Sequence, residues 1–325
     1  MNSKRIFNKI RIITLLILTM VSGLTYTQNY PTRPIRIINP MASGGSNDIV
    51  ARMLMKAMTA ELGQPVYVEN KPGAGGNIGT EFVARSISDG HTLLVTLGSF
   101  AINPSLSRQI AYDPIKDFKA ISKLTTYSLF LVAHPSTPAR SIQELISLAK
   151  AKPNQLMFGS AGVGGSTHLA GELLKSMAGI EIVHVGYKGG APTMLALLSG
   201  EIALSFNGTS VFPHLQSKKL IPLGVTGSRR MSAAPDVPTI AESGVPGYEV
   251  LGWCALFAPS GTSPLIVEKL NQLARRWLNN VETKMALEAQ GLDADPGTPQ
   301  ELDKWVKSEL VKWAKLIKDV GIKNE

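Results

Sequence analysis

Two short glycine-serine segments carry residue types that could hold an anion. Residues 43–46 (SGGS) and 162–167 (GVGGST) each follow a short apolar run and precede a helical pattern. The first turn of a helix leaves backbone N–H groups without internal partners and carries positive potential, and glycine lets a ligand approach the backbone closely. Such a segment can bind a carboxylate or a phosphate without a buried lysine or arginine, whereas one alone would be an ordinary helix cap.

The two segments hold matched places in an internal similarity of the chain. Gly44 and Gly164 are 120 positions apart. Each helical pattern is followed by another strand and a further glycine loop, over residues 70–76 and 187–192. Two similar α/β units predict two lobes, and ligands of open α/β sheets sit outside the carboxyl ends of the strands. We therefore predict a ligand cleft between two lobes.

Polar residues near the same strand ends are further candidates for contact with a ligand. Asp48 could contact a ligand amine, although an acidic residue at a helix start more commonly caps the helix. Ser99 and Asn103 follow an expected strand and either face the pocket or form a turn. Tyr187 precedes the second glycine loop and could line the cleft, and Asn207 closes another strand at the same edge.

A secreted hydrolase is the enzymatic alternative. His168 and His184 could assemble with Ser160 or Ser166 into a nucleophilic site, but the sequence contains no GxSxG nucleophile elbow. A position near the cleft for His168 and a structural hydrogen bond for His184 are the simpler interpretations. We therefore expect a binding protein and not an enzyme.

Cofactor and metal signals are weak. Residues 73–79 (GAGGNIG) fit only a looser GxGxxxG variant of the dinucleotide fingerprint, and the phosphate-loop pattern ending in Gly-Lys-Ser/Thr does not occur. The histidines are scattered along the sequence, without an HExxH or CxxC motif. We therefore expect neither a cofactor nor a metal.

The first 27 residues have the pattern of a secretory signal peptide. Four basic residues within residues 1–11 precede an apolar run over residues 12–24, broken by a few small or hydroxyl residues. The run is shorter than the about 20 residues of a spanning helix, so a retained membrane anchor is the less favoured alternative. Cleavage is expected between Gly23 and Gln28, which predicts a periplasmic protein.

Charge and cysteine content narrow the class further. Without the four basic residues of the signal peptide, the formal net charge falls from +9 to +5. The basic residues form no stripe interleaved with aromatics, so nucleic acid is not an expected partner. The single cysteine, Cys254, lies in the apolar run 250–258, which predicts a buried, inert thiol and no internal disulfide.

Short apolar runs alternate with helical patterns along the mature chain. Strands are expected over residues 35–38, 66–69, 92–96, 129–133, 156–159, 182–185, 202–206 and 220–226, and helices over 48–62, 142–151 and 167–177. This alternation predicts an α/β fold with mixed, mostly parallel sheets flanked by helices. The last third is helical, and residues 298–301 (TPQE) form a capping box before a helix whose apolar stripe we interpret as core.

A family resemblance extends over the whole mature chain. It rests on residues 30–36 (YPTRPIR), 44–52 (GGSNDIVAR), 64–79 (QPVYVENKPGAGGNIG), 89–94 (DGHTLL), 101–106 (AINPSL), 168–172 (HLAGE), 184–189 (HVGYKG), 235–239 (PDVPT) and 244–248 (GVPGY). In this order and at these intervals, the segments resemble the Bug-type, TctC-like periplasmic solute-binding receptors of tripartite tricarboxylate transporters.

The resemblance implies a two-lobed, type II-like periplasmic-binding fold. Lobe 1 would comprise residues 30–125 and 227–325, and lobe 2 would comprise residues 126–226. The ligand would be a small carboxylate (an organic acid, a dicarboxylate or an acidic amino acid), delivered by a monomeric receptor to membrane subunits of the transporter. A sensory receptor that docks on a sensor kinase is the alternative that the residues leave open.

The resemblance also implies a carboxylate held by the two helix starts, largely through backbone groups and water. With the polar candidates above, the expected ligand-binding residues are Met41, Ser43, Gly44, Gly45, Ser46, Asp48, Ser99, Asn103, Ser160, Gly162, Gly164, Ser166, Thr167, His168, Tyr187 and Asn207. The chain departs from the family pattern at Met41 (commonly aromatic), at Ser43 and Gly186 (commonly proline) and at Asn207 (commonly aspartate). Ligand identity therefore does not transfer.

Overall fold

The computed structural model describes residues 30–107, 110–231 and 233–322. Residues 30–32 belong to a separate N-terminal unit, and the fold below is that of the unit that begins at Arg33. The predicted signal peptide, residues 1–27, lies outside the described residues. Within the described ranges, no helix is both long enough and apolar enough to cross a membrane.

The first sheet has six strands in the order β11-β4-β10-β3-β1-β2. Its strands are β1 (Ile35–Asn39), β2 (Val66–Asn70), β3 (Thr92–Leu97), β4 (Phe118–Ser128), β10 (Leu251–Pro259) and β11 (Asp293–Ala294). Strand β1 pairs in parallel with β2 and β3, while β10 runs antiparallel to β3 and β4. We call this sheet with its helices the first lobe.

The second sheet has five strands in the order β7-β6-β8-β5-β9. Its strands are β5 (Phe130–Ala133), β6 (Met157–Ser160), β7 (Val183–Gly186), β8 (Leu204–Asn207) and β9 (Ile221–Val225). Strand β6 pairs in parallel with β7 and β8, while β5 runs antiparallel to β8 and β9. We call this sheet with its helices the second lobe.

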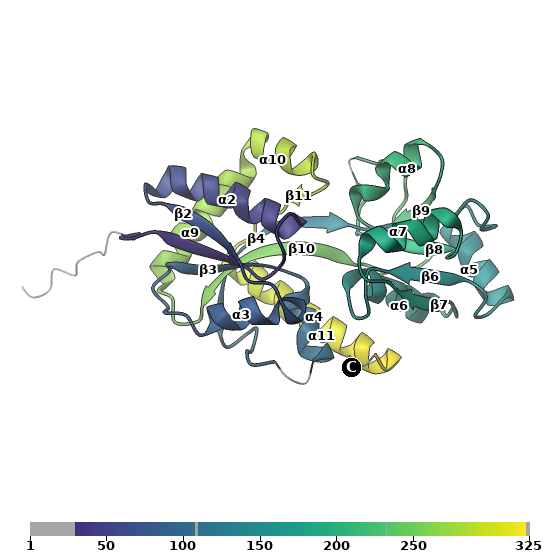
Figure 1. The fold of residues 1–325 in the computed structure, drawn as a ribbon, viewed down its shortest axis with the longest axis horizontal. Coiled ribbons are helices and arrows are strands. Elements are labelled where there is room, and N and C mark those ends of the chain that lie inside the picture. Colours follow the sequence, from purple (N-terminus) through teal and green to yellow (C-terminus); the bar gives the residue numbers. More distant parts are fainter. Residues whose placement is uncertain (1–29, 108–109, 232, 323–325) are drawn as a thin grey trace, which may run out of the picture. The chain divides into compact units, whose positions relative to one another are not determined.

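The predicted two-lobed α/β architecture is confirmed, with one correction to the strand directions. Both sheets are mixed, but parallel pairing is confined to β1–β3 and β6–β8. The reason is that β4 ends at Ser128 and β5 begins at Phe130, so the chain changes sheets after one residue and β5 enters the second sheet antiparallel to its neighbours. The chain returns to the first sheet before β10 (Figure 1).

Helices flank both sheets. They are α2 (Ser46–Leu62), α3 (Asn77–Ala84), α4 (Ser99–Leu106), α5 (Ile142–Ala151), α6 (Ser166–Ala178), α7 (Gly190–Ser199), α8 (Phe212–Gln216), α9 (Pro264–Asn279), α10 (Val281–Glu288) and α11 (Pro299–Val320). Figure 1 shows α2 and α9 beside the first sheet and α6 and α7 beside the second. The expected capping box is confirmed, because Thr298 and Glu301 bond each other at the start of α11. At the start of α5, Ser141 accepts from the Glu144 N–H.

The elements that border the two lobes are anchored by a buried aromatic core. The Phe100 ring of α4 lies 4.7 Å from the Phe257 ring of β10, and α11 buries Trp313 and Ile317. Burying side chains of this size stabilises the fold by about 1.5–3 kcal/mol each. Cys254 is buried, as predicted, and its thiol donates to Asn47 Oδ1 over 3.0 Å. This core fixes α4, β10 and α11 relative to one another.

Candidate functional site

A cavity of about 320 Å³ lies between the two lobes. We call it the interlobe cavity. It is lined by Met41, Gly75, residues 97–99, Ile102, Asn103, Leu106, Tyr127, residues 163–166, residues 250–252, Glu309 and Trp313. One side of the cavity is formed by the carboxyl end of β3, the long strands β4 and β10, and helix α11. The other side is formed by the start of α6.

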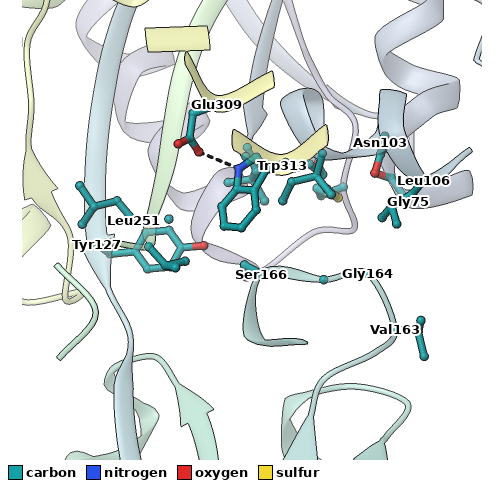
Figure 2. Close-up of a pocket in the computed structure, with 18 residues that line it drawn as sticks. Gly75, Asn103, Leu106, Tyr127, Val163, Gly164, Ser166, Leu251, Glu309 and Trp313 are labelled. Carbon is teal, nitrogen blue, oxygen red and sulfur yellow. Dashed lines mark hydrogen bonds between the residues drawn. The ribbon is translucent and has the colours of Figure 1, made fainter. Parts of the chain in front are cut away.

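The start of α6 lines the cavity. Gly165 is the N-cap, and its helix start has no side-chain cap hydrogen bond. Gly164, Gly165 and Ser166 all line the cavity, and Figure 2 shows Gly164 and Ser166 below the Trp313 ring. Because the first-turn N–H groups have no intrahelical partner and the helix dipole adds positive potential, this start suits an anion.

A second helix start lines the opposite side. Gly98 is the N-cap of α4, again without a side-chain cap hydrogen bond, and Ser99 is the first residue of the helix. An added Cβ at Gly98 would lie 3.4 Å from the indole nitrogen of Trp253, so glycine suits this crowded turn. The sequence left a turn as the alternative for Ser99 and Asn103, whereas the structure places both on this helix.

The cavity wall opposite the start of α6, formed by Tyr127, Glu309 and Trp313, is aromatic and contains one buried carboxylate. Glu309 Oε2 accepts hydrogen bonds from the indole Nε1 of Trp313 (2.9 Å) and of Trp253 (3.3 Å), and Glu309 also pairs with Lys312. Tyr127 points its hydroxyl toward the space between Trp313 and Ser166 (Figure 2). Burial raises the pKa of Tyr127 to about 12, so its hydroxyl stays neutral at physiological pH.

Sequence reasoning missed this wall. Trp313 was predicted to be core, which it is, and Tyr127 lies on a strand that was not expected. The available signal was Glu309 on the apolar face of its expected helix, between Trp305 and Trp313. Acidic residues are seldom fully buried without partners, so a glutamate at this position indicates a carboxylate with buried partners.

The first glycine-serine segment lies beside the cavity-lining residue Met41. Asp48 accepts hydrogen bonds from Ser43 Oγ (3.1 Å) and the Gly44 N–H (3.0 Å), and it pairs with Arg52 (2.9 Å). Burial alone would raise the pKa of Asp48, but hydrogen bonds from Arg52, Asn70, Gly44 and Ser43 outweigh it and hold that pKa well below its usual range. Asp48 therefore organises this helix start as a permanent anion.

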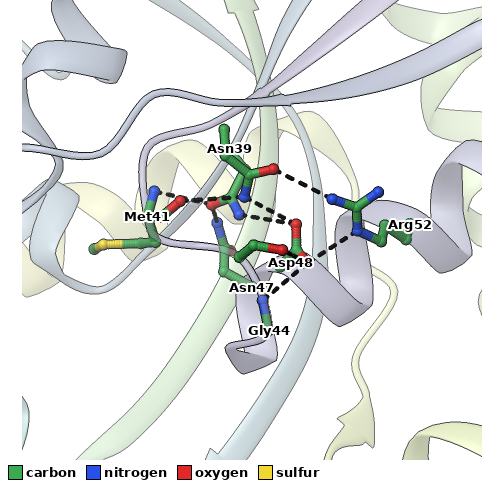
Figure 3. A network of polar contacts seen from close by, with 8 residues as sticks. Asn39, Met41, Gly44, Asn47, Asp48 and Arg52 are labelled. Atoms are coloured by element: carbon green, nitrogen blue, oxygen red, sulfur yellow. Dashed lines mark hydrogen bonds and ion pairs between the residues drawn. The ribbon is translucent and has the colours of Figure 1, made fainter.

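The same network fixes the Met41 backbone. Asn39 Oδ1 accepts from the Met41 N–H over 3.0 Å, and Asn70 Nδ2 donates to the Met41 carbonyl over 3.2 Å (Figure 3). Both asparagines also donate to Asp48 Oδ1. Met41 is thus held at the cavity, while Gly44 and Gly45 stay exposed.

Two stacked histidines support the start of α6. The rings of His168 and His184 lie 3.7 Å apart, and His168 Nδ1 accepts from the Gly164 N–H over 2.9 Å. His168 Nε2 therefore carries the proton and faces Glu172 Oε1 at 3.6 Å. Burial lowers the pKa of His184 to about 4, so its ring is neutral at pH 7. The pair positions the Gly164 turn.

The contacts of these histidines differ from those of a hydrolase. Ser160 Oγ lies 2.7 Å from His184 Nε2, but Ser160 is fully buried and its hydroxyl also bonds the Gly162 backbone. His168 contacts Gly164 and Glu172. The serine that contacts His184 is therefore inaccessible from solvent, unlike the nucleophile of a hydrolase.

Three further predicted residues lie away from the cavity. Thr167 Oγ1 accepts from the Ala161 N–H over 3.0 Å, and the Tyr187 hydroxyl donates to Glu201 over 2.7 Å. Asn207 is buried at the end of β8, and its Nδ2 has no hydrogen-bond partner among the described residues. These three side chains do not line the interlobe cavity.

The cavity brings together only part of the predicted set. The predicted residues that line it are Met41, Ser99, Asn103, Gly164 and Ser166. Those that lie outside its lining are Ser43, Gly44, Gly45, Ser46, Asp48, Ser160, Gly162, Thr167, His168, Tyr187 and Asn207. Ligand contact by the residues of either group stays a prediction.

The lining offers little to a metal or a dinucleotide. Glu309 is the one charged side chain among the lining residues, and no three His, Cys, Asp or Glu side chains of the described residues gather as a metal site. In the glycine-rich segment 73–79, an added Cβ at Gly79 would lie 2.8 Å from Pro40 Cα. Close packing therefore accounts for Gly79.

Comparison with known proteins places the chain in a family. The sequence model of the tripartite tricarboxylate transporter family receptor matches residues 50–322. The chain belongs to this receptor family. This receptor is 36% identical over 297 residues to the protein BugT of Bordetella pertussis. The aligned region covers 90% of this chain and 91% of that protein.

Solved structures of similar receptors confirm the fold. The receptor is similar to R. palustris Rpa4515 with adipate, at a TM-score of 0.78 and 34% identity, over 91% of this chain and 100% of that one. It is also similar to the periplasmic binding protein BugD, at a TM-score of 0.74 and 34% identity, over the same shares of the two chains. The predicted Bug-type, TctC-like receptor with a two-lobed periplasmic-binding fold is confirmed, and the relatives are solute-binding proteins.

Proposed function

We propose that this receptor captures a small carboxylate in the interlobe cavity and delivers it to the membrane subunits of a tripartite tricarboxylate-type transporter. The observation that carries the proposal is the uncapped start of α6, whose Gly164, Gly165 and Ser166 line the cavity. A carboxylate there accepts hydrogen bonds from first-turn N–H groups and gains from the helix dipole. The adipate bound to the similar R. palustris protein supports this ligand class.

Capture involves closure of the two lobes. The first glycine-serine segment is exposed, and an added Cβ at Gly44 or Gly45 would meet nothing within 4 Å. Its helix start is also uncapped at Gly45. Closure of the lobes around β4, β10 and the chain between them brings this second amide-rich start onto the ligand. The lobe boundaries of this proposal are those expected from the sequence, residues 30–125 with 227–325, and residues 126–226.

The family and the predicted signal peptide support delivery to a transporter. A cleaved signal over residues 1–27 would place the receptor in the periplasm. The closed form then docks on the transporter. Affinity for the ligand is expected to be micromolar or tighter, about −8 kcal/mol.

The test is isothermal titration calorimetry of the mature protein with mono-, di- and tricarboxylates, acidic amino acids and neutral sugars. Gly165→Asp places a carboxylate at the N-cap of α6, in a residue position where aspartate is structurally favourable. Gly165→Asn has the same shape without the charge. We expect carboxylate binding in the wild type, weaker binding in Gly165→Asn and the largest loss in Gly165→Asp.

The matched variant Gly45→Asp probes the first helix start separately. If closure brings that start onto the ligand, Gly45→Asp also abolishes binding by repulsion. Unchanged affinity in Gly45→Asp would show that the first glycine-serine segment does not contact the ligand. Binding of a sugar and of no carboxylate would contradict the proposed function itself.

A further inference from the structure

The interlobe cavity is lined by one acidic side chain, whose cationic partner Lys312 lies outside the lining. Among the lining residues there is no lysine, arginine or histidine, and Glu309 is the one charged side chain. Its side chain is 4% exposed and lies behind the Trp313 ring. Lys312 pairs with Glu309 from outside the lining and offsets part of its charge. Glu309 still disfavours a second carboxylate placed next to it, because a poorly solvated site screens charges less than water does.

The hydrogen-bond donors near Glu309 are already engaged. Glu309 accepts from both indole N–H groups, those of Trp253 and Trp313. The amide of Asn103, another polar lining residue, donates to Gly75 O over 3.0 Å and to Asn77 Oδ1 over 2.7 Å. The donors that remain on this side are the hydroxyls of Tyr127 and Ser99 and the uncapped start of α4. All of them are neutral, and neutral donors compensate a second buried charge less fully than a cation does.

The other lining side chains on this side are apolar. Leu97, Ile102, Leu106, Leu251 and Trp313 line the cavity together with the Tyr127 ring. Figure 2 shows Leu251 and Tyr127 on one side of Trp313 and Leu106 on the other, all above Ser166. A ligand whose carboxylate meets the start of α6 therefore places its remaining carbon atoms against this apolar wall, where burial of each methylene is favourable.

We propose that the interlobe cavity selects acids with one carboxylate and an apolar body and discriminates against dicarboxylates, with Glu309 as a specificity-determining residue. The selection rests on the proposed function, because it assumes that one carboxylate sits at the start of α6. It separates this receptor from the R. palustris relative that holds adipate. Repulsion by Glu309 and the absence of a cation among the lining residues act together against a second carboxylate.

The experiment compares matched ligands by titration calorimetry on the mature wild-type protein. Hexanoate and adipate share a six-carbon chain and differ in the second carboxylate, and benzoate and terephthalate form an aromatic pair. Hexanamide replaces the carboxylate of hexanoate by a neutral amide. We expect the monocarboxylate of at least one pair to bind at least about tenfold more tightly than its dicarboxylate.

The outcomes separate the two proposals. Equal or tighter binding of the dicarboxylates would overturn the selection and leave carboxylate capture intact. Hexanamide binding as tightly as hexanoate would instead contradict the proposed function. Failure of all four acids to bind, while another carboxylate of the panel binds, would overturn the selection for an apolar body.

Two variants test the cause of the selection. Glu309→Gln removes the charge with little change of shape, and Met41→Lys adds a cation at the cavity lining without disturbing the buried indole pair. We expect each variant to lower the affinity ratio of monocarboxylate to matched dicarboxylate by about tenfold. Asp319→Asn removes an exposed charge from the same helix, where Asp319 pairs with Lys315, and should leave the preference unchanged. An unchanged preference in both Glu309→Gln and Met41→Lys would overturn the role of charge.

Discussion

Gly252 and Tyr127 face each other across strands β10 and β4, and an added Cβ at Gly252 would lie 2.0 Å from Cζ of the Tyr127 ring. The ring lies against the glycine because no side chain occupies that position. We predict that Gly252→Ala displaces Tyr127 in the cavity, weakens ligand binding and lowers the free energy of unfolding by about 1–3 kcal/mol. Calorimetry and urea denaturation measure the two effects.

Gly190→Ala is the control for this substitution, since an added Cβ at Gly190 meets nothing within 4 Å. It should leave both binding and stability near wild-type values. Wild-type affinity in Gly252→Ala would show that the position of Tyr127 does not matter to the ligand.

Gly164 is expected to be essential for binding for two separable reasons. Its φ is +75°, and an added Cβ would lie 2.5 Å from Leu106 Cδ1 on the cavity lining. Gly179 has a φ of +60° with open space around it, so Gly179→Ala isolates the backbone strain. Strain in either variant should cost roughly 1–2 kcal/mol of unfolding free energy. Only Gly164→Ala should lose ligand binding, and equal affinities in the two variants would contradict the role of this turn.

Asp48→Asn should destabilise the first helix start. The change leaves the donors of Gly44, Ser43 and Arg52 facing a neutral amide, which should lower the free energy of unfolding by about 1–3 kcal/mol at pH 7. Because the folded-state pKa of Asp48 is lowered, the stabilisation is present above the unfolded pKa of 3.8 and is lost as the pH falls below it. Urea denaturation at pH 7 and near pH 3 should therefore show a shrinking difference from wild type. Asp319→Asn is the exposed control, and a difference that grows on acidification would be inconsistent with this account.

His184 should titrate far below an ordinary histidine. Burial lowers its pKa to about 4 from 6.5, and the stacked His168 adds to the shift, whereas Glu172 opposes it. An NMR titration of the imidazole protons should give a midpoint near 4. Since the unfolded chain binds the proton first, this group removes stability as the pH falls from about 6.5 to 4. A midpoint near 6.5 would mean that the ring is solvated and does not support the Gly164 turn.

Periodicity and caps predicted some of the elements around the site. The helix over residues 142–151 has the predicted bounds, and the strand from Ile35 ends one residue later than expected. These successes have local causes: the Ser141 cap and alternating apolar runs act within a few residues. The second helix start, at Gly165, was also recognisable because glycine and hydroxyl residues precede an apolar helix.

The composition of the cavity could not be predicted in the same way. Tyr127 reaches the cavity because β4 is long enough to extend toward the second sheet, and its position depends on pairing with Gly252, far away in the sequence. Ser99 and Asn103 lie on a short helix containing Pro104, which obscures a helical pattern. Glu309 and Trp313 serve the core and the cavity at once, and only tertiary contacts reveal the second role.

The most direct measurement is a crystal structure of the mature protein with a bound carboxylate, such as hexanoate. The account predicts a carboxylate oxygen within about 3 Å of a first-turn backbone nitrogen of α6, at Ser166 or Thr167, with the carbon chain against Trp313 and Tyr127. A carboxylate bound elsewhere, with the start of α6 facing only water, would contradict it.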